Sequence, residues 1–242
     1  MIINNISSID DSMLLNFKSL RNNNLSKNQF IADSEKVVLK LLGSNFKTKV
    51  ILGTDDFFKR NEIILKQTDA TLYTAPKKIM EDIVGFRLHH GVMAIGEGDT
   101  FFPLDCKDTI ISLNGITSPE NVGAIIRNIS GFGFKSVLVD SKTCSPFTRR
   151  SIRVSMGNIF GLKTSRTEHL LNTLTELQNN GYSIIGTANI NSAISLKEFK
   201  AYPKTVLIIG SEGFGIDKEI LSICDEVVKI PIQNSVGHLN AA

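Results

Sequence analysis

The stretch TIISLNGITSPENVGAIIRN, residues 109–128, contains the pattern that decides the fold class of this chain. Its first five residues are mostly apolar, as in a buried strand, and a polar loop follows them. Ser118, Pro119 and Glu120 then supply an N-cap, a first-turn proline and an early acid for a helix. The apolar residues that recur at helical spacing are Val122, Ile125, Ile126 and Ile129. The stretch predicts a strand, a loop and a helix over 119–131.

The same alternation of strand and helix continues to the end of the chain. Further short apolar runs predict strands at 136–140, 182–188, 205–210 and 226–232. Helices are expected between these strands, at 146–158, 168–180 and 217–223. Strands that are apolar throughout suit a parallel sheet covered on both faces. The second half is therefore predicted to be an α/β domain that binds ligands beyond the carboxyl ends of its strands.

A mixed Gly, Pro and acidic stretch at 96–108 marks the expected domain boundary. It divides the chain into a first domain, a linker and a second domain, at 1–98, 99–106 and 107–242. The first domain is expected to be a small α/β unit. Its expected elements are a helix within NQFIADSEKVVLKLLG (28–43), strands at 49–53, 69–75 and 91–95, and a helix at 76–85.

The composition is that of an ordinary globular protein: 242 residues, 42% hydrophobic, 21% charged and a net charge of +3. This charge permits nucleic-acid binding without requiring it. Cys106, Cys144 and Cys224 are scattered, which argues against a disulfide framework or a zinc site and suits a reducing compartment. With no apolar run of about 18 residues and no signal-peptide pattern, we expect a cytoplasmic protein without membrane or metal binding.

Three stretches carry polar or small residues that packing does not require. The first has Asn121, Gly123 and Arg127 on the helix at 119–131, which could equally be a packed helix with its arginine in water. The second, VLIIGSEGFGI (206–216), is a strand that runs into a glycine-rich turn, but it matches neither GxGxxG nor GxxxxGK[ST]. The third, VVKIPIQNSVGHLNAA (227–242), reads as a binding loop or as a frayed terminus.

A fourth stretch, residues 145–163, is basic. Arg149, Arg150, Arg153 and Ser155 combine guanidinium groups with a hydroxyl, as phosphate-positioning sites do, so RNA binding is one interpretation. A solvated helix face is the other interpretation, and the composition alone favours it.

The first three stretches, in this order and spacing, resemble the motifs of the SpoU (TrmH-type) RNA ribose 2′-O-methyltransferases of the SPOUT superfamily. SPENVGAIIRN is similar to the Asn-x-Gly-x-x-x-Arg motif, LIIGSEGFGI to the Gly-Ser/Ala-Glu-Gly loop, and IPIQNSVGHLN to a motif that ends in Ser-Leu-Asn. The resemblance covers residues 107–242, with His238 in place of the usual serine. The first domain is similar, more loosely, to a ribosomal-protein-like (L30e-like) substrate domain.

The resemblance implies a deep C-terminal trefoil knot, a homodimer that completes the active site, and S-adenosyl-L-methionine as methyl donor. The polar residues that it implies for catalysis are Arg127, Asn121, Glu212 and Asn240. Those assigned to the cofactor are Gly210, Ile230, Leu239 and Thr187, the last of which lies near the end of the strand expected at 182–188. The implied reaction is methylation of a ribose 2′-hydroxyl in ribosomal or transfer RNA, with ribosomal RNA slightly preferred.

Two alternatives remain at this point. A non-catalytic RNA-binding protein that keeps the scaffold is favoured by His238 and by the end of the sequence at Ala242, before the helix with which the family continues. A Rossmann-type nucleotide-binding enzyme is suggested only by the glycines of GSEGFG. The lack of a GxGxxG motif counts against it.

Overall fold

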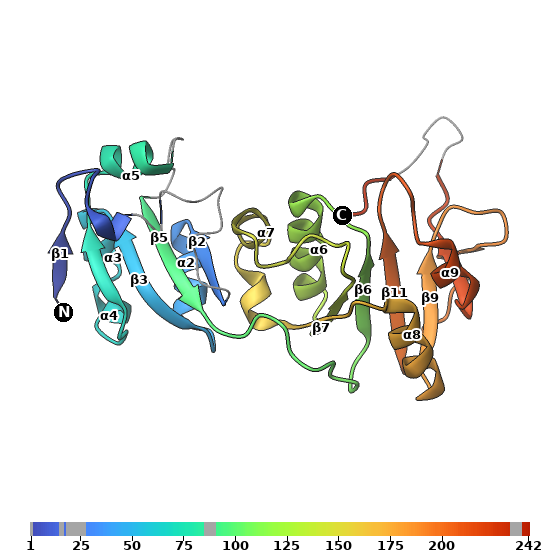
Figure 1. Ribbon diagram of the computed structural model, residues 1–242. Helices are drawn as coiled ribbons and strands as arrows, with labels where there is room; N and C mark the ends of the chain where they lie inside the picture. Colours follow the sequence, from blue (N-terminus) through green and yellow to red (C-terminus); the bar gives the residue numbers. More distant parts are fainter. Residues whose placement is uncertain (1, 15–16, 18–27, 85–90, 233–238) are drawn as a thin grey trace. The chain divides into compact units, whose positions relative to one another are not determined.

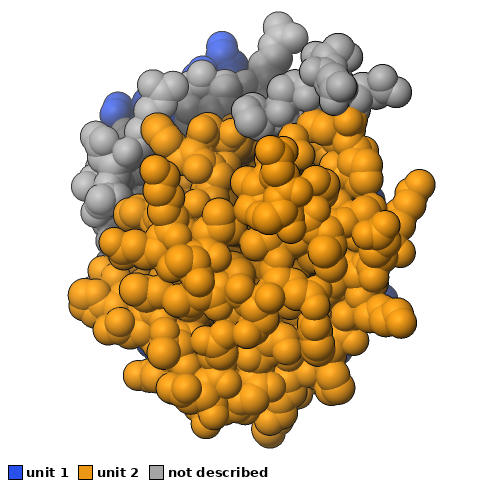
Figure 2. Space-filling view, turned by 90° about the vertical axis from the view of Figure 1, so that its right-hand side faces the viewer, with its two compact units in different colours: residues 1–100, 147–160 blue, residues 101–146, 161–242 orange. Residues whose placement is uncertain are grey.

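The computed structural model describes residues 2–14, 17, 28–84, 91–232 and 239–242 (Figure 1). The chain forms two compact units, coloured separately in Figure 2. Unit 1 contains residues 1–100 and 147–160, and unit 2 contains residues 101–146 and 161–242. The first division falls in the expected linker. The second was not expected, because the prediction placed all of 107–242 in one domain.

Unit 2 is built on a parallel sheet with seven strands in the described part of the chain. Their order is β10-β12-β9-β11-β6-β7-β8. The strands are β6 (Ile110–Asn114), β7 (Ser136–Val139), β8 (Lys163–Arg166), β9 (Ser183–Thr187), β10 (Ile194–Ser195), β11 (Thr205–Gly210) and β12 (Glu226–Lys229). The predicted parallel α/β fold is confirmed for this unit, although the sequence analysis missed β8 and β10.

Helices cover both faces of this sheet. Helices α8 (Leu170–Asn179) and α9 (Lys218–Ser222) pack with the strands in one apolar cluster. That cluster contains Ile110, Leu138, Leu170, Leu174, Leu177, Tyr182, Ile184, Val206, Ile208, Ile216 and Ile220. Helix α6 (Pro119–Gly131) connects β6 to β7 in the opposite direction along the sheet, so a right-handed crossover places it on the other face.

Helix α6 has the predicted bounds. The Ser118 hydroxyl accepts a hydrogen bond from the Asn121 amide, and Pro119 occupies the first turn, as the N-cap pattern requires. The helix expected at 146–158 is shorter, because α7 spans only Arg149–Val154. Met156 and Gly157 adopt φ values of 55° and 73°, which end the α-helix. A 3-10 helix, η2 (Asn158–Gly161), follows.

Unit 1 has a mixed sheet with strand order β1-β4-β3-β5-β2 among its described residues. The strands are β1 (Ile3–Asn5), β2 (Gln29–Asp33), β3 (Lys47–Gly53), β4 (Thr71–Thr74) and β5 (Val92–Glu97). The helices with bounds in the described part of 1–100 are η1 (Ser12–Leu14), α2 (Glu35–Leu42), α3 (Asp55–Arg60), α4 (Glu62–Leu65) and α5 (Lys77–Val84), and the segment 147–160 adds α7. The helix expected within 28–43 is restricted to α2, since Gln29–Asp33 pairs with β5 as an antiparallel strand.

Residues 147–160 join unit 1 through aromatic packing and an ion pair. Phe147 and Phe160 each lie 5.5 Å, between ring centroids, from Phe30 of β2. Asp33, at the end of β2, is only 2% exposed, and its carboxylate pairs with the guanidinium groups of Arg149 and Arg153. These contacts explain why the segment does not group with unit 2.

We expect Asp33→Ala to lower the free energy of unfolding by about 2 kcal/mol, because it leaves two partly buried guanidinium groups without their carboxylate. Chemical denaturation of the variant and the parent measures this difference. Asp69→Ala is the matched control, since Asp69 is exposed in the same unit. An Asp33 variant as stable as the Asp69 control would contradict the structural role of the ion pair.

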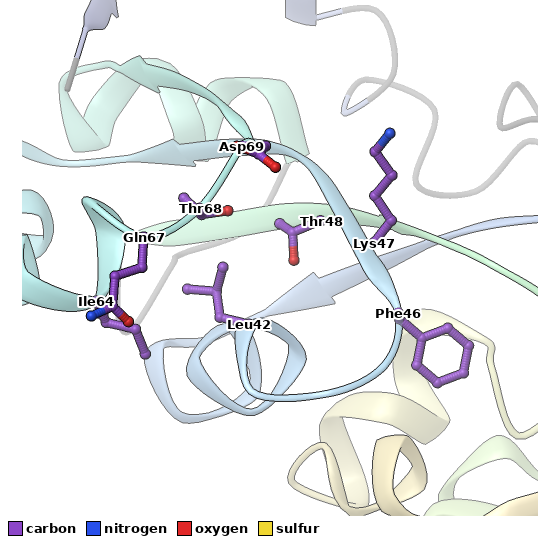
Figure 3. A pocket seen from close by; sticks show the side chains of 8 residues that line it. All are labelled: Leu42, Phe46, Lys47, Thr48, Ile64, Gln67, Thr68 and Asp69. Carbon is purple, nitrogen blue, oxygen red and sulfur yellow. The ribbon is translucent and has the colours of Figure 1, made fainter.

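Unit 1 also contains an open pocket of about 290 Å³ (Figure 3). Its side chains come from the end of α2, the start of β3 and the segment that begins in α4. They are Leu42, Phe46, Lys47, Thr48, Ile64, Gln67, Thr68 and Asp69. None of these residues belongs to the motifs singled out in the sequence, so the pocket is not the predicted site.

Candidate functional site

The strand order of unit 2 creates a topological switch point between β6 and β11. These strands are neighbours, and Asn114 and Gly210 are paired at their carboxyl ends. From β6 the chain continues to β7, on one side, whereas from β11 it continues to β12, on the other. The loops at 115–118 and 211–217 therefore leave the same edge of the sheet at the position where α/β domains bind ligands.

A buried amide fixes the start of the first loop and the end of the second. Asn114 is 1% exposed, and its Nδ2 donates to Asp140 Oδ2 at 2.9 Å and to Asp217 Oδ2 at 3.1 Å. Its side-chain oxygen accepts from the backbone N–H of Asp217 at 2.8 Å. Asn114 thus joins the end of β6 to the start of α9. The sequence analysis did not assign this role, although a polar residue at the end of an apolar strand was a usable signal.

Two further buried polar residues hold the loop after β6. Asp140 accepts hydrogen bonds from the backbone amides of Gly115, at 3.0 Å, and of Thr143, at 2.7 Å. The Thr143 hydroxyl accepts from the Ile116 amide and donates to the Leu113 carbonyl, each at 3.2 Å. The loop that leads into α6 is therefore held at Gly115 and Ile116, which positions the first turn of that helix.

The pKa of Asp217 is lowered by its hydrogen bonds in this network. A hydrogen bond from Lys142 at 2.9 Å is the main cause that lowers the pKa of Asp217, and the hydrogen bond from Asn114 is the next. Because the folded-state pKa is lowered, the contribution to stability is present above the ordinary value of 3.8. It is lost as the pH falls through the folded-state pKa.

We expect Lys142→Met to raise the pKa of Asp217 toward 3.8, because the variant removes the hydrogen bond and the positive charge that favour the carboxylate. The carboxyl-carbon chemical shift of Asp217, followed by NMR over acidic pH, measures the change. Lys135→Met, at another exposed lysine, is the control. An unchanged titration in the Lys142 variant would assign the shift to Asn114 instead.

The structure brings two predicted catalytic residues together. Asn121, in the first turn of α6, donates a hydrogen bond from its side-chain amide to the Glu212 carboxylate. The two residues are 91 positions apart in sequence, and each comes from a different motif. Both side chains are partly buried at the switch point, where a ligand could reach them.

The loop that carries Glu212 is tightly folded. Ser211 and Gly215 exchange backbone hydrogen bonds of 3.1 and 2.9 Å, and Gly215 has a φ of 70°. A Cβ atom on Gly210 would lie 2.3 Å from the carbonyl carbon of Gly215. Only glycine fits at position 210, so this predicted cofactor residue has a structural role as well.

Arg127 takes no part in the hydrogen bond between Asn121 and Glu212. It is exposed, and no hydrogen bond or ion pair of its guanidinium group is found among the described residues. It lies six residues after Asn121, which is about 9 Å along the helix and roughly two-thirds of a turn around it. Within one chain the helix therefore presents Asn121 and Arg127 in different directions.

The remaining predicted cofactor residues lie at or after the same sheet edge. Thr187 ends β9, next to β11, and its hydroxyl donates to the Ile208 carbonyl at 2.8 Å. Ile230 and Leu239 are 56% and 48% exposed. Asn240 is exposed, and its side-chain oxygen accepts from the Ala242 amide. His238 lies outside the described residues.

The basic segment at 145–163 differs from the expectation of a free RNA-binding face. Arg149 and Arg153 pair with Asp33, and Ser155 is fully buried with its hydroxyl bonded to the Ile152 carbonyl. The side chain of Ser155 faces the protein interior, where RNA cannot reach it, so the expected RNA contact of this residue is corrected. Arg150 is exposed.

The described residues show neither a metal-binding cluster nor a membrane-spanning helix. They contain no group of three or more His, Cys, Asp or Glu side chains that could hold a metal ion. No described helix has both the length and the apolar character to cross a membrane.

A parallel α/β sheet with polar loops at its switch point defines unit 2 as a doubly wound α/β domain. Residues 108–242 match the model of the SpoU rRNA Methylase family, and the chain belongs to that family. An uncharacterized tRNA/rRNA methyltransferase of Mycobacterium tuberculosis is 29% identical over 88% of this chain and 76% of its own length. The mitochondrial rRNA methyltransferase 1 of Dictyostelium discoideum is 36% identical over 49% of this chain and 23% of its own length.

Solved structures share the fold of the whole chain. The AdoMet-bound rRNA methyltransferase from Sinorhizobium meliloti has a TM-score of 0.83 at 18% identity, and covers 99% of this chain and 93% of its own. The SpoU methyltransferase AviRb from Streptomyces viridochromogenes, in complex with AdoMet, has a TM-score of 0.78 at 20% identity, with 96% and 93% covered. At these identities the likeness concerns the fold.

Proposed function

We propose that this chain transfers a methyl group from S-adenosyl-L-methionine to a ribose 2′-hydroxyl of RNA. The hydrogen bond between Asn121 and Glu212 carries the proposal. It joins two motifs of the family-matched region at the switch point of the sheet, where a ligand is expected. Membership of an rRNA methylase family supports RNA as the substrate class.

The residues at this edge fit the proposed methyl donor. Ile230 and Leu239 offer exposed apolar surface for an adenosyl group. The loop at 211–217 contains Glu212 and Asp217 and no lysine or arginine, so its charge suits a ligand with a cationic sulfonium rather than a phosphate. Gly210 keeps that loop close to β11. When bound, the donor would supply an activated methyl group.

We assign Arg127 to the RNA and the reacting oxygen. An arginine stays protonated at neutral pH, so it is poorly suited to act as a general base. Its guanidinium group can instead bind a phosphate beside the target ribose and stabilise the alkoxide that develops as the hydroxyl proton leaves. Asn121, Glu212 and Asn240 would orient the ribose and the donor. Alignment of the reacting atoms then provides much of the rate enhancement.

Because Arg127 and Asn121 point in different directions within one chain, we propose that a homodimer completes the active site. Arg127 of one protomer would then face the Asn121–Glu212 pair of its partner. The trefoil knot formed by the C-terminal segment belongs to the same proposal. Sedimentation velocity tests the dimer, and a monomer with full turnover would contradict it.

We further propose unit 1 as the domain that binds the RNA substrate, with Arg150 as a candidate phosphate contact. A separate substrate domain suits a folded RNA feature, so ribosomal RNA is slightly preferred over transfer RNA. The cytoplasm is the proposed location, which suits three scattered free cysteines. Methylation of purified ribosomal and transfer RNA, each without its native modifications, distinguishes these substrates.

One experiment tests the central proposal. Calorimetric titration with S-adenosyl-L-methionine measures cofactor binding, and transfer of its labelled methyl group to unmodified RNA measures activity. A 2′-O-methylated ribose blocks alkaline cleavage of the adjacent phosphodiester, so labelled dinucleotides that survive alkali identify the site. Transfer to a base would overturn the ribose assignment. Cofactor binding without transfer would favour a non-catalytic RNA-binding protein, and no cofactor binding would contradict the proposal.

A further inference from the structure

The loop between β11 and α9 presents an aromatic ring to solvent. Phe214 is 97% exposed, although phenylalanine is among the residues most often buried in proteins. Its neighbours Gly213 and Gly215 are also exposed and have no side chain to cover the ring. No ring contact of Phe214 with another aromatic residue is found in the described part of the chain.

The loop holds the backbone of Phe214 in a defined position. Besides the reciprocal backbone hydrogen bonds between Ser211 and Gly215, the Phe214 amide donates to the Ser211 hydroxyl at 3.2 Å. The close approach of Gly210 to Gly215 fixes the base of the loop. A loop with these internal contacts loses little conformational entropy when its ring binds a flat partner.

The position and charge of the loop select the kind of partner. Glu212, two residues before Phe214, forms the contact with Asn121 that marks the candidate site. The only charged residues in 211–217 are the acids Glu212 and Asp217, which disfavour an RNA phosphate. A nucleobase has an uncharged face that stacks on aromatic side chains, and proteins recognise unpaired RNA bases in this way.

We propose that Phe214 stacks on an unpaired base of the RNA substrate and thereby positions the ribose that is methylated. The inference rests on the proposed function and deepens it, because it adds a substrate contact at the same site. Stacking of this kind predicts that Phe214→Ala weakens RNA binding about 10-fold. Phe214→Tyr, which keeps the aromatic face, should bind RNA nearly as well as the parent.

Fluorescence gives a direct test, because the chain contains no tryptophan. Phe214→Trp introduces a single reporter, and stacking with a base should quench its emission when an unmodified single-stranded oligoribonucleotide is added. The same ribose-phosphate chain without bases should leave the emission unchanged. Phe132→Trp is the matched control, since Phe132 is 80% exposed at the other end of α6, and its emission should not respond.

Several outcomes would overturn the proposal. Equal quenching by the abasic chain would indicate a backbone contact, and quenching by S-adenosyl-L-methionine alone would assign the ring to the cofactor. A blue shift that grows with protein concentration, without RNA, would assign it to a second copy of the chain. Equal RNA affinity of Phe214→Ala and the parent would also exclude stacking.

The binding test separates this inference from the proposed function. Base-dependent quenching in a protein that transfers no methyl group would support the stacking and contradict the enzyme. Methyl transfer with an unchanged KM for RNA in Phe214→Ala would support the enzyme and contradict the stacking. Calorimetric affinity for S-adenosyl-L-methionine should be the same in Phe214→Ala and the parent.

Discussion

Gly210→Ala is expected to lower the free energy of unfolding by about 3 kcal/mol and to abolish binding of S-adenosyl-L-methionine. The added Cβ would lie 2.3 Å from the Gly215 carbonyl carbon and 2.5 Å from the Ile216 nitrogen, so backbone atoms must move. Displacement of this backbone separates Ser211 from Gly215 and moves Glu212 away from Asn121. Chemical denaturation measures the stability, and calorimetry measures the cofactor affinity.

Gly213→Ala is the matched control, because it adds the same methyl group three residues away in the same loop. A Cβ at Gly213 meets no atom within 4 Å. The control should therefore change the unfolding free energy by no more than about 0.5 kcal/mol. If both variants lost stability equally, the packing of Gly210 against Gly215 would not be the cause.

Arg127→Lys is expected to reduce kcat for methyl transfer at least about 100-fold, with little change in the affinity for S-adenosyl-L-methionine. Lysine keeps the positive charge but lacks the planar fork that binds two phosphate oxygens at once. The side chain is exposed on α6, so the variant should fold as well as the parent. Single-turnover kinetics on unmodified RNA measure the loss, and calorimetry measures the cofactor affinity.

Asn128→Ala, at the adjacent exposed position of α6, controls for a general effect of changing this surface. Its kcat should stay within about 2-fold of the parent, as expected for a surface position away from the chemistry. Near-normal turnover in Arg127→Lys would show that charge alone suffices, and the proposed bidentate contact would be wrong.

The fold was predictable where local chemistry and packing agree. Helix α6 has the predicted bounds because Ser118 caps it and its apolar residues share one face. Strand β8 was missed because its sequence, KTSR, has no apolar pattern, although Thr164 and Ser165 are buried beside β7. The pairing of β8 with β7 decides its structure, and a local pattern does not contain that pairing.

The same distinction applies to the site. The motifs identified Asn121 and Glu212, which the structure places in contact. The network of Asn114, Asp140 and Thr143 was missed because its partners come from separate segments whose proximity only the sheet creates. The ion pairs of Arg149 and Arg153 were missed because their carboxylate partner, Asp33, lies more than a hundred residues earlier in the sequence.

Residues 147–160 limit how this protein can be cut and recombined. They lie in sequence inside the region that matches the family model, yet their aromatic rings pack on β2 of unit 1. A fragment that begins at residue 101 would expose Phe147 and Phe160 to solvent and would be prone to aggregation. Exchange of unit 1 between related chains therefore requires the short internal segment to be transplanted together with the N-terminal residues.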